Sequence, residues 1–330
     1  MRNSLFILIL TLFLNGCGNN NAEYIFNEGF IFGTTYHIKY ENKEGDLHNE
    51  IKELLMSVNQ SLSPFDTNSI IGRFNSGADN VLADSFFIDV FNKANEVYKL
   101  SDGAFDITIA PLVNLWGFGF EKHEVINDQI IDSLLQFVGM ENIFIENDTI
   151  YRQKEGIILN ASAIAKGYGV DVVAFLFKSR GINNFMIEIG GEVFAKGVNQ
   201  KRKIWQIAVE NPINQGEFEI IVPLDNKALA TSGNYRNFNT IDGQKQGHII
   251  DPRTGYPVQS SLLSASIIAN NCMTADAFAT ACMVLGLEKS IELIEKTENV
   301  EGAFIYQIDE NGTVGIKFTN GFPTVQNGFH

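Results

Sequence analysis

Hydrophobic residues recur at helical spacing in several parts of the chain. Within residues 46–63, Ile51, Leu54, Leu55 and Val58 fall on one face of a helix, which predicts an amphipathic helix packed on a core. The same spacing predicts helices over 84–103, 128–139 and 162–181, and a largely apolar run from 271 onward predicts a buried helix. Helices therefore account for a large part of the expected structure.

Other stretches alternate between apolar and polar residues, the pattern of a strand with one buried face. Residues 33–41 show it clearly. Further strands are expected over 184–197, 204–212, 217–224 and 261–269, with a hairpin at 142–153 and a final strand pair flanking 309–315. The small residues of 228–238 predict a turn. Without a strict βαβ repeat or a GxGxxG motif, the pattern predicts an α+β fold with largely antiparallel sheets flanked by helices, a single catalytic unit whose division into two lobes is left open.

The N-terminus has the features of a targeting segment. Arg2 supplies a positive charge, and the apolar run 5–14 is too short to span a bilayer. The run ends in the sequence LNGC, whose last residue is Cys17, and this resembles a bacterial lipoprotein signal. The resemblance implies cleavage before Cys17 and lipidation of that residue, with an ordinary secretory peptide as the alternative. Residues 18–27 are then expected to be a polar tether and 28–330 the folded domain.

Composition narrows the choice of ligands. The chain has 330 residues, 45% of them hydrophobic and 19% charged, which indicates a folded globular protein. Its net charge of −15 argues against binding nucleic acid, because a negative surface repels phosphate backbones. A phosphate-bearing ligand would have to be held locally by a cation, helix N-termini or a few basic groups. Cys272 and Cys282 lie about 15 Å apart if both are on one helix, too far for a disulfide.

Asp276 is the only charged residue in the stretch 271–283 and allows two interpretations. Thr274 is a suitable N-cap, and an acidic residue in the first turn of a helix is favoured by the helix dipole. Alternatively Asp276 is a metal ligand, because Thr280 lies four residues later and places a second oxygen on the same helix face. The segment alone favours the first interpretation.

Four further stretches combine polar residues with turn signals. They are 101–119, 159–171, 228–238 and 248–258. The first is typical of a turn that feeds a core strand, and in the second Ser162 is expected to cap the following helix. The fourth places His248 before the turn DPRTG. Each stretch alone is more typical of structure than of catalysis.

In this order and spacing, the stretches resemble the FAD:protein FMN transferase family, the ApbE-like flavin transferases. The resemblance begins at 32–38, continues through 61–75, includes the four stretches and ends with 274–286. Departures are small: Phe32 stands where Met is common in the family, and Phe65 where Tyr is common. The resemblance covers nearly the whole chain after the targeting segment. It implies that residues 28–330 form a flavin transferase domain.

The resemblance implies a reaction. Such enzymes cleave the pyrophosphate of FAD and transfer FMN to a Thr or Ser hydroxyl of a target protein, with release of AMP. Phosphoryl transfer needs charge neutralisation and alignment, so Mg²⁺ is the expected cofactor. The expected partners are FAD and an exported or membrane acceptor such as a redox-pump subunit, and the expected location is the bacterial cell envelope. An Mg²⁺-dependent FAD pyrophosphatase and a noncatalytic flavin-binding lipoprotein remain alternatives.

The resemblance also implies roles for individual residues. Mg²⁺ would be held by the Asp276 carboxylate, the Thr280 hydroxyl and the backbone carbonyl of Ala165, which are the hard oxygen ligands that this ion prefers. The residues expected to contact FAD are Phe32, Phe65, Ala104, Phe105, Asp106, Ser162, Tyr168 and Ile250. For Phe65, core packing is the alternative, since the chain has 26 Phe residues.

His248 is the candidate general base. A neutral imidazole is suited to take the proton of an acceptor hydroxyl near physiological pH. The alternative is a histidine that only hydrogen-bonds the DPRTG turn. Lys166 and Arg253 could contact phosphate, but structural ion pairing is an equally good interpretation of both.

Overall fold

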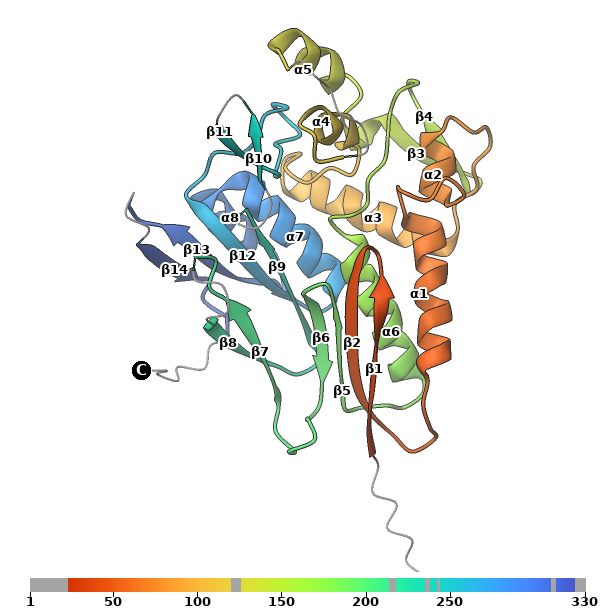
Figure 1. Ribbon diagram of the computed structural model, residues 1–330, viewed down its shortest axis with the longest axis vertical. Coiled ribbons are helices and arrows are strands. Elements are labelled where there is room, and N and C mark those ends of the chain that lie inside the picture. The colour runs from red at the N-terminus through yellow and green to blue at the C-terminus, as the bar shows by residue number, and fades with distance from the viewer. Residues whose placement is uncertain are drawn as a thin grey trace, which may run out of the picture.

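A computed structural model describes residues 23–119, 126–213, 218–234, 238–241, 244–309 and 313–323. Within these ranges the main element is an eight-stranded sheet in which every neighbouring pair is antiparallel (Figure 1). Its spatial order is β1 (Glu23–Ile31), β2 (Thr34–Asn42), β5 (Phe185–Ile189), β6 (Glu192–Lys196), β9 (Lys227–Gly233), β12 (Leu262–Ala269), β13 (Glu301–Gln307) and β14 (Val314–Phe318).

Both faces of the central strands are buried, because side chains alternate between two cores. On β6, Phe194 belongs to the large core beneath the helices, whereas Val193 and Ala195 belong to a smaller cluster on the opposite face. The smaller cluster is closed by a separate hairpin, β7 (Trp205–Glu210) and β8 (Phe218–Leu224), through residues such as Trp205 and Val222. The sheet is therefore sandwiched between this hairpin and the helices.

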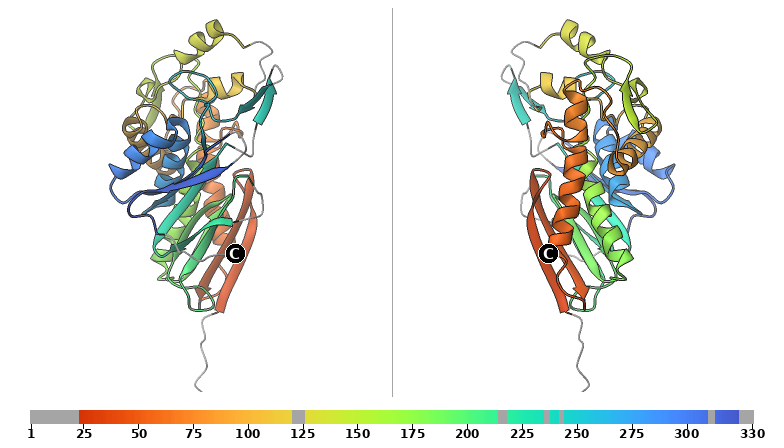
Figure 2. Two further views of the ribbon diagram at one scale, coloured as in Figure 1. Left: turned by 90° about the vertical axis from the view of Figure 1, so that its left-hand side faces the viewer. Right: turned by 90° about the vertical axis from the view of Figure 1, so that its right-hand side faces the viewer.

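The helices form the other side of the molecule, as the two side views show (Figure 2). Their bounds are α1 (His48–Leu62), α2 (Ile70–Asn75), α3 (Ser85–Leu100), α4 (Ala110–Leu115), α5 (Asp128–Leu135), α6 (Ala165–Ser179), α7 (Cys272–Leu285) and α8 (Leu287–Glu295), with a 3₁₀ turn at Met140–Asn142. Helix α6 packs on β5 and β6, α7 on β9 and β12, and α8 on β13. Helices α1 and α3 form a further layer against α6 and α7 respectively.

A third, small cluster lies at the periphery and joins α4, α5 and the segment that follows Gly247. Its buried members are Leu112, Leu115, Trp116, Ile131 and Ile250. The indole N–H of Trp116 also donates a hydrogen bond of 2.7 Å to the carbonyl of Gly255. The remaining short strands are β3 (Ile143–Glu146) paired with β4 (Thr149–Arg152), and β10 (Phe238–Ile241) paired with β11 (Gln244–Gly247). The cluster therefore fixes the DPRTG turn to α4.

Most of the predicted elements are confirmed, with shifts of a few residues at their ends. The predicted helices correspond to α1, α3, α5, α6 and α7, and the predicted strands to β2, β5 to β8, β12 and the final pair β13 and β14. The stretch 184–197 forms two strands because Gly190 and Gly191, with φ of 61° and 104°, make a tight turn in its middle. The hairpin at 142–153 is β3 and β4. The α+β class with antiparallel sheets is confirmed.

Two predictions about the sheet are wrong. The stretch 228–238 was expected to be a turn, but most of it forms β9, a central strand; residues 235–237 lie outside the described part. Its alanines are small because α7 packs directly on this strand. The range 18–27 was expected to be a tether, but β1 begins at Glu23 and pairs with β2 along its whole length. The predicted signal at 1–17 and residues 18–22 lie outside the described residues.

Two predicted helix caps are also wrong. Helix α7 begins at Cys272 and its N-cap is Asn271, whose side chain accepts the backbone N–H of Thr274 at 2.8 Å. Asp276 therefore lies in the second turn, beyond the position where an acid acts on the helix end. Ser162 does not cap α6, because the N-cap position is Ile164 and makes no side-chain cap bond. The stretch 101–119 leads into α4 rather than into a core strand.

In the described part of the chain no helix is long and apolar enough to cross a membrane.

Candidate active site

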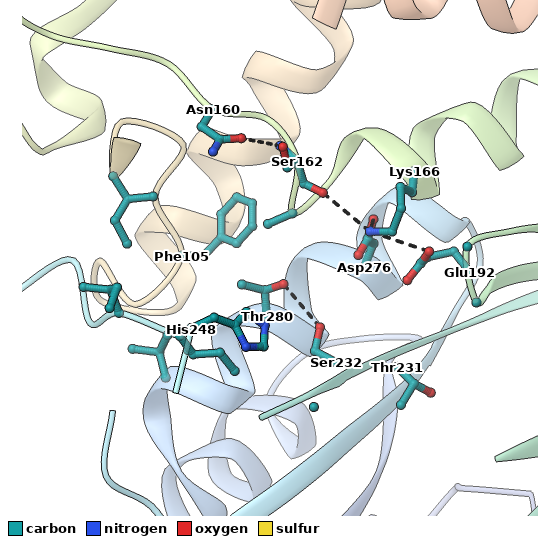
Figure 3. A pocket seen from close by; sticks show the side chains of 18 of the residues that line it. Phe105, Asn160, Ser162, Lys166, Glu192, Thr231, Ser232, His248, Asp276 and Thr280 are labelled. Atoms are coloured by element: carbon teal, nitrogen blue, oxygen red, sulfur yellow. Dashed lines mark hydrogen bonds and ion pairs between the residues drawn. The ribbon is translucent and has the colours of Figure 1, made fainter. Parts of the chain in front are cut away.

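A cavity of about 490 Å³ lies between the helical layer and the ends of central strands of the sheet (Figure 3). Its wall comes from the loop before α4, the segment leading into α6, the β5–β6 turn, the ends of β7 and β9, the segment after β11, and α7. The volume is in the range of small-molecule sites. Among the residues expected from the sequence to act at a site, the cavity is lined by Ala104, Phe105, Asp106, Ser162, Lys166, His248, Ile250, Asp276 and Thr280.

Asp276 is held at the contact between α6 and α7 by hydrogen bonds that run in both directions. The backbone N–H of Gly167 on α6 donates to Oδ2 of Asp276 at 3.0 Å. In return Asp171 on α6 accepts the backbone N–H groups of Cys272 and Met273 at 2.7 and 2.8 Å, and so caps α7. A Cβ at Gly167 would lie 2.5 Å from the Cys272 carbonyl oxygen, so only glycine permits this approach. The position of Asp276 therefore depends on both helices.

Two buried carboxylates share one ammonium group in the cavity. Lys166 Nζ lies 3.8 Å from Oδ2 of Asp276 and 3.6 Å from Oε2 of Glu192. Burial raises the pKa of Asp276, against the opposing effects of Lys166 and of the Gly167 N–H. Burial likewise raises the pKa of Glu192, to about 8. Burial alone would lower the pKa of Lys166, but Asp276 and Glu192 together raise it above its usual value. The site therefore favours an additional positive charge.

The donor set fits Mg²⁺ bound together with a phosphate ligand. In the described ranges no group of three or more His, Cys, Asp or Glu side chains is arranged to hold a metal ion by itself. Mg²⁺ commonly binds through one or two carboxylates and completes its shell with water and substrate phosphates. The Asp276 carboxylate and the Thr280 hydroxyl are such hard oxygen donors, and both line the cavity. The residues present therefore fit the ion.

Hydroxyl groups from the sheet support Thr280. Its Oγ1 lies 3.3 Å from Oγ of Ser232, at the end of β9. The preceding residue, Thr231, pairs with Ser266 of β12 through a hydroxyl contact of 2.8 Å. Thr231, Ser232 and Thr280 all line the cavity. This row of neutral donors can bind phosphate oxygens without adding charge.

Asp106 is buried, but part of its hydrogen-bonding capacity is already used. Its Oδ1 accepts both the backbone N–H and the hydroxyl of Thr108, at 2.7 and 2.6 Å. The same Thr108 hydroxyl accepts the N–H of Gly139, so Asp106 organises two loops. Burial raises the pKa of Asp106 to about 6, although the bonds from Thr108 oppose the rise. Only the rest of its carboxylate can contact a ligand.

His248 lies on the segment that the third cluster fixes in place. Its ring faces Phe118 edge to face, with 6.2 Å between ring centres, and Ile250 anchors the segment in the small core. His248 lines the cavity, as Figure 3 shows. Arg253 does not line it: its guanidinium makes two hydrogen bonds to Asp251 within the DPRTG turn. For Arg253, the structural interpretation is therefore the better one.

Four of the expected residues do not line the cavity. Phe65 is 73% exposed, so the alternative of core packing is wrong for it. Phe32 covers α6, where a Cβ at Gly169 would lie 2.5 Å from its ring. The Tyr168 hydroxyl donates to Asp89 on α3 at 2.7 Å. Ala165 is the first residue of α6, beside the cavity-lining Lys166. The FAD roles of Phe32, Phe65 and Tyr168 and the metal role of Ala165 stay predictions.

Sequence reasoning missed several lining residues. They are Ile109, Val113, Asn160, Ala163, Gly190, Gly191, Glu192, Ala208, Val209, Glu210, Thr231, Ser232, Gly233, Ile249, Pro252 and Val284. Thr231 and Ser232 fall in the stretch 228–238, for which the sequence predicts a turn and the structure has β9. Glu192 follows two glycines after a buried strand. The sequence contains this pattern, but the same pattern is typical of any hairpin and does not indicate a site.

Comparisons with known proteins show the family of this chain. The model of the ApbE family matches residues 32–304. A protein from Vibrio cholerae named FAD:protein FMN transferase is 38% identical over 308 residues, covering 90% of this chain and 92% of its own, and a namesake from Haemophilus influenzae is 36% identical over 308 residues, covering 87% and 88%. The structure of the flavin transferase ApbE from Vibrio cholerae superposes with a TM-score of 0.82 at 35% identity, covering 91% of this chain and 98% of that one. The chain belongs to the ApbE family.

Proposed function

We propose that this protein is an FAD:protein FMN transferase. It cleaves the P–O–P bond of FAD and joins the FMN phosphorus to a Thr or Ser hydroxyl oxygen of an acceptor protein, and AMP leaves. The observation that carries the proposal is that one cavity gathers Asp276 and Thr280 of α7 together with His248 of the segment after β11. Similarity to proteins of that name along nine-tenths of the chain supports it.

Several of the lining residues have a part in this reaction. His248 takes the proton of the attacking hydroxyl, since an imidazole is the usual side chain for this task. The hydroxyl group of Ser232 orients phosphate oxygens, and the apolar Phe105 and Ile250 exclude water from their side of the cavity. Exclusion of water favours transfer to a protein hydroxyl over hydrolysis.

Asp276 and Thr280 would hold Mg²⁺, with the Ala165 carbonyl as a further ligand carried over from the family. When bound, this ion supplies positive charge that neutralises the pyrophosphate and stabilises the leaving phosphate. The protein's own contribution is to keep Asp276 in place through the Gly167 N–H and the capped start of α7. An acidic protein of net charge −15 can in this way bind an anionic substrate.

The test is incubation with FAD, Mg²⁺ and a candidate acceptor, followed by mass spectrometry of the acceptor. We expect an adduct on a Thr or Ser that adds the mass of FMN less one water, and AMP in equal amount. Release of free FMN and AMP without an adduct would instead identify a pyrophosphatase. FAD that is retained intact would identify a binding protein.

Two variants separate the roles within the site. Asp276→Ala should abolish AMP release, because it removes the charged ligand proposed for Mg²⁺. His248→Ala should keep FAD affinity while transfer falls by roughly 10²–10⁴-fold, the usual contribution of a general base, and the pH–rate profile should lose one ionisation. A His248→Ala protein that loses stability and FAD affinity together, and keeps the wild-type pH profile, would show that His248 only braces its turn.

We also propose that the protein is anchored in the bacterial cell envelope by a lipid on Cys17, facing away from the cytoplasm. The apolar run followed by LNGC supports this. The acceptor is then a membrane or exported protein, since the enzyme and its target must meet on the same side of the membrane.

A further inference from the structure

Glu192 is a buried carboxylate that the fold leaves incompletely partnered. It is the first residue of β6, directly after the Gly190–Gly191 turn, and only 4% of its surface is exposed. Among the described residues, no group donates a hydrogen bond to its Oε2, although Glu192 lines the cavity. Burying a carboxylate without full pairing is costly, and such groups usually meet a cation or a ligand.

When both acids are ionised, the charges around Glu192 do not balance. Lys166 is the cation shared by Glu192 and Asp276, at 3.6 and 3.8 Å, and both distances exceed that of a normal charged hydrogen bond. One ammonium therefore faces two buried carboxylates, and Figure 3 shows the three side chains converging at one end of the cavity. A divalent cation at this point would reverse the deficit of positive charge.

Lys166 is placed so that it can move aside. Its side chain is 25% exposed, whereas that of Glu192 is 5% and that of Asp276 is 3% exposed. Its flexible stem passes the β5–β6 turn, where a Cβ at Gly190 would lie 3.2 Å from Lys166 Cδ. The absence of a side chain at Gly190 leaves room for the stem, and the ammonium can turn toward solvent or toward a phosphate while the carboxylates stay fixed.

We propose that Glu192 is a second carboxylate of the cation site, binding the ion directly or through a water molecule, and that Lys166 occupies the place of the ion until it arrives. This deepens the proposed function, on which it rests. The site then holds its two carboxyl groups in place in the ion-free protein, and ion binding releases Lys166 to contact the phosphates of the substrate.

The test measures the binding of Mn²⁺ to the FAD-free protein. The concentration of unbound Mn²⁺ is followed by electron paramagnetic resonance. Glu192→Gln keeps the shape of the side chain and should weaken Mn²⁺ binding by about 10–100-fold, the usual effect of removing a supporting group from a metal site. Lys166→Met keeps the stem but removes the competing charge, and should bind Mn²⁺ several-fold more tightly than wild type.

The matched control is Glu188→Gln, an isosteric change on the adjacent strand. Glu188 faces His37 and the Gly191 N–H rather than the cavity, and its amide variant can still accept that N–H. Its Mn²⁺ affinity should equal that of wild type. Thermal unfolding of each ion-free variant checks folding, and the stabilisation gained on adding Mn²⁺ should be smaller in Glu192→Gln only.

Equal Mn²⁺ affinities for Glu192→Gln and Glu188→Gln would overturn the inference, as would a wild-type protein that binds no Mn²⁺ without FAD. Weaker binding on Lys166→Met would overturn the part assigned to Lys166. If the wild type forms the FMN adduct and Glu192→Gln binds Mn²⁺ as tightly as the wild type, this inference is wrong and the proposed function stands. A wild type that binds Mn²⁺ through Glu192 but forms no adduct contradicts the proposed function instead.

Discussion

Gly167 lies where α6 touches the start of α7, and replacing it with alanine tests whether the contact between these helices positions the active site. The new Cβ would lie 2.5 Å from the Cys272 carbonyl oxygen and 2.8 Å from Asp276 Cβ. Neither is the end of a flexible side chain, so α7 has to move. Overpacking of this kind costs about 1–3 kcal/mol. Alanine stabilises a helix by about 1 kcal/mol relative to glycine, so the net loss of stability is about 0–2 kcal/mol.

The effect on catalysis should be much larger than the effect on stability. A shift of about 1 Å in a group that aligns the reaction can reduce the rate by about 10²-fold, and Asp276 moves with α7. We expect Gly167→Ala to melt only a few degrees below wild type, and to transfer FMN roughly 10²-fold more slowly.

Gly169→Ala is the matched control, because it lies on the same helix and gains the same helix propensity. Its Cβ meets the ring of Phe32, 2.5 Å away, at the outer edge of a side chain that can turn. Its transfer rate should stay well above that of Gly167→Ala when both are measured at saturating FAD. Wild-type activity in Gly167→Ala, or equal losses in the two variants, would refute the idea that the contact between α6 and α7 positions Asp276.

Three further predictions concern other parts of the molecule. Cys17→Ala should move the protein from the membrane to the soluble fraction of cells, and unchanged fractionation would contradict lipidation. Trp116→Phe removes the hydrogen bond to the Gly255 carbonyl, so it should lower the free energy of unfolding by about 1–3 kcal/mol and slow transfer by loosening the segment of His248; denaturant unfolding and a transfer assay with no change would contradict this. Burial raises the pKa of Asp106 to about 6, so its stabilising contribution is complete below about pH 4 and is lost as the pH rises toward 6. Melting temperatures across this range should fall less for Asp106→Asn than for wild type, and parallel curves would disprove the assignment.

The regular part of the fold could be predicted because its periodicities are strong, whereas β9 could not. Its sequence, KALATSG, has the small and polar residues of a loop. Those residues are small because Ala228 and Ala230 lie against α7, which packs on this strand. That reason exists only after α7 is placed. The N-cap of α7 shows the same limit, since Asn271 and Thr274 are both good capping residues and only the packing against Asp171 selects the start of the helix.

Site residues that belong to a sequence motif could be predicted. Site residues whose role depends on a neighbour in space, far away in the sequence, could not. Asp276, Thr280 and His248 were assigned from motifs, and the fold brings them to one cavity. Glu192 carries no motif: its significance comes from the 3.6 Å to Lys166, a residue 26 positions earlier on another element. Phe65 shows the reverse, a motif position whose ring is mostly exposed. A single sequence shows the residue type at each position, but not which other residues it contacts in the fold.

The cavity wall runs through the chain from Ala104 to Val284, and this order matters while the protein is being made. A growing chain has Ser162 and Lys166 long before it has α7, so no early fragment can hold the flavin. The central strands β6, β9 and β12 pair across long stretches of sequence, and such distant pairings form slowly. FAD can stabilise only the completed fold, because a ligand stabilises the state that binds it. A shortage of flavin should therefore leave the folding of this protein unaffected, and limit only how long the finished molecule survives.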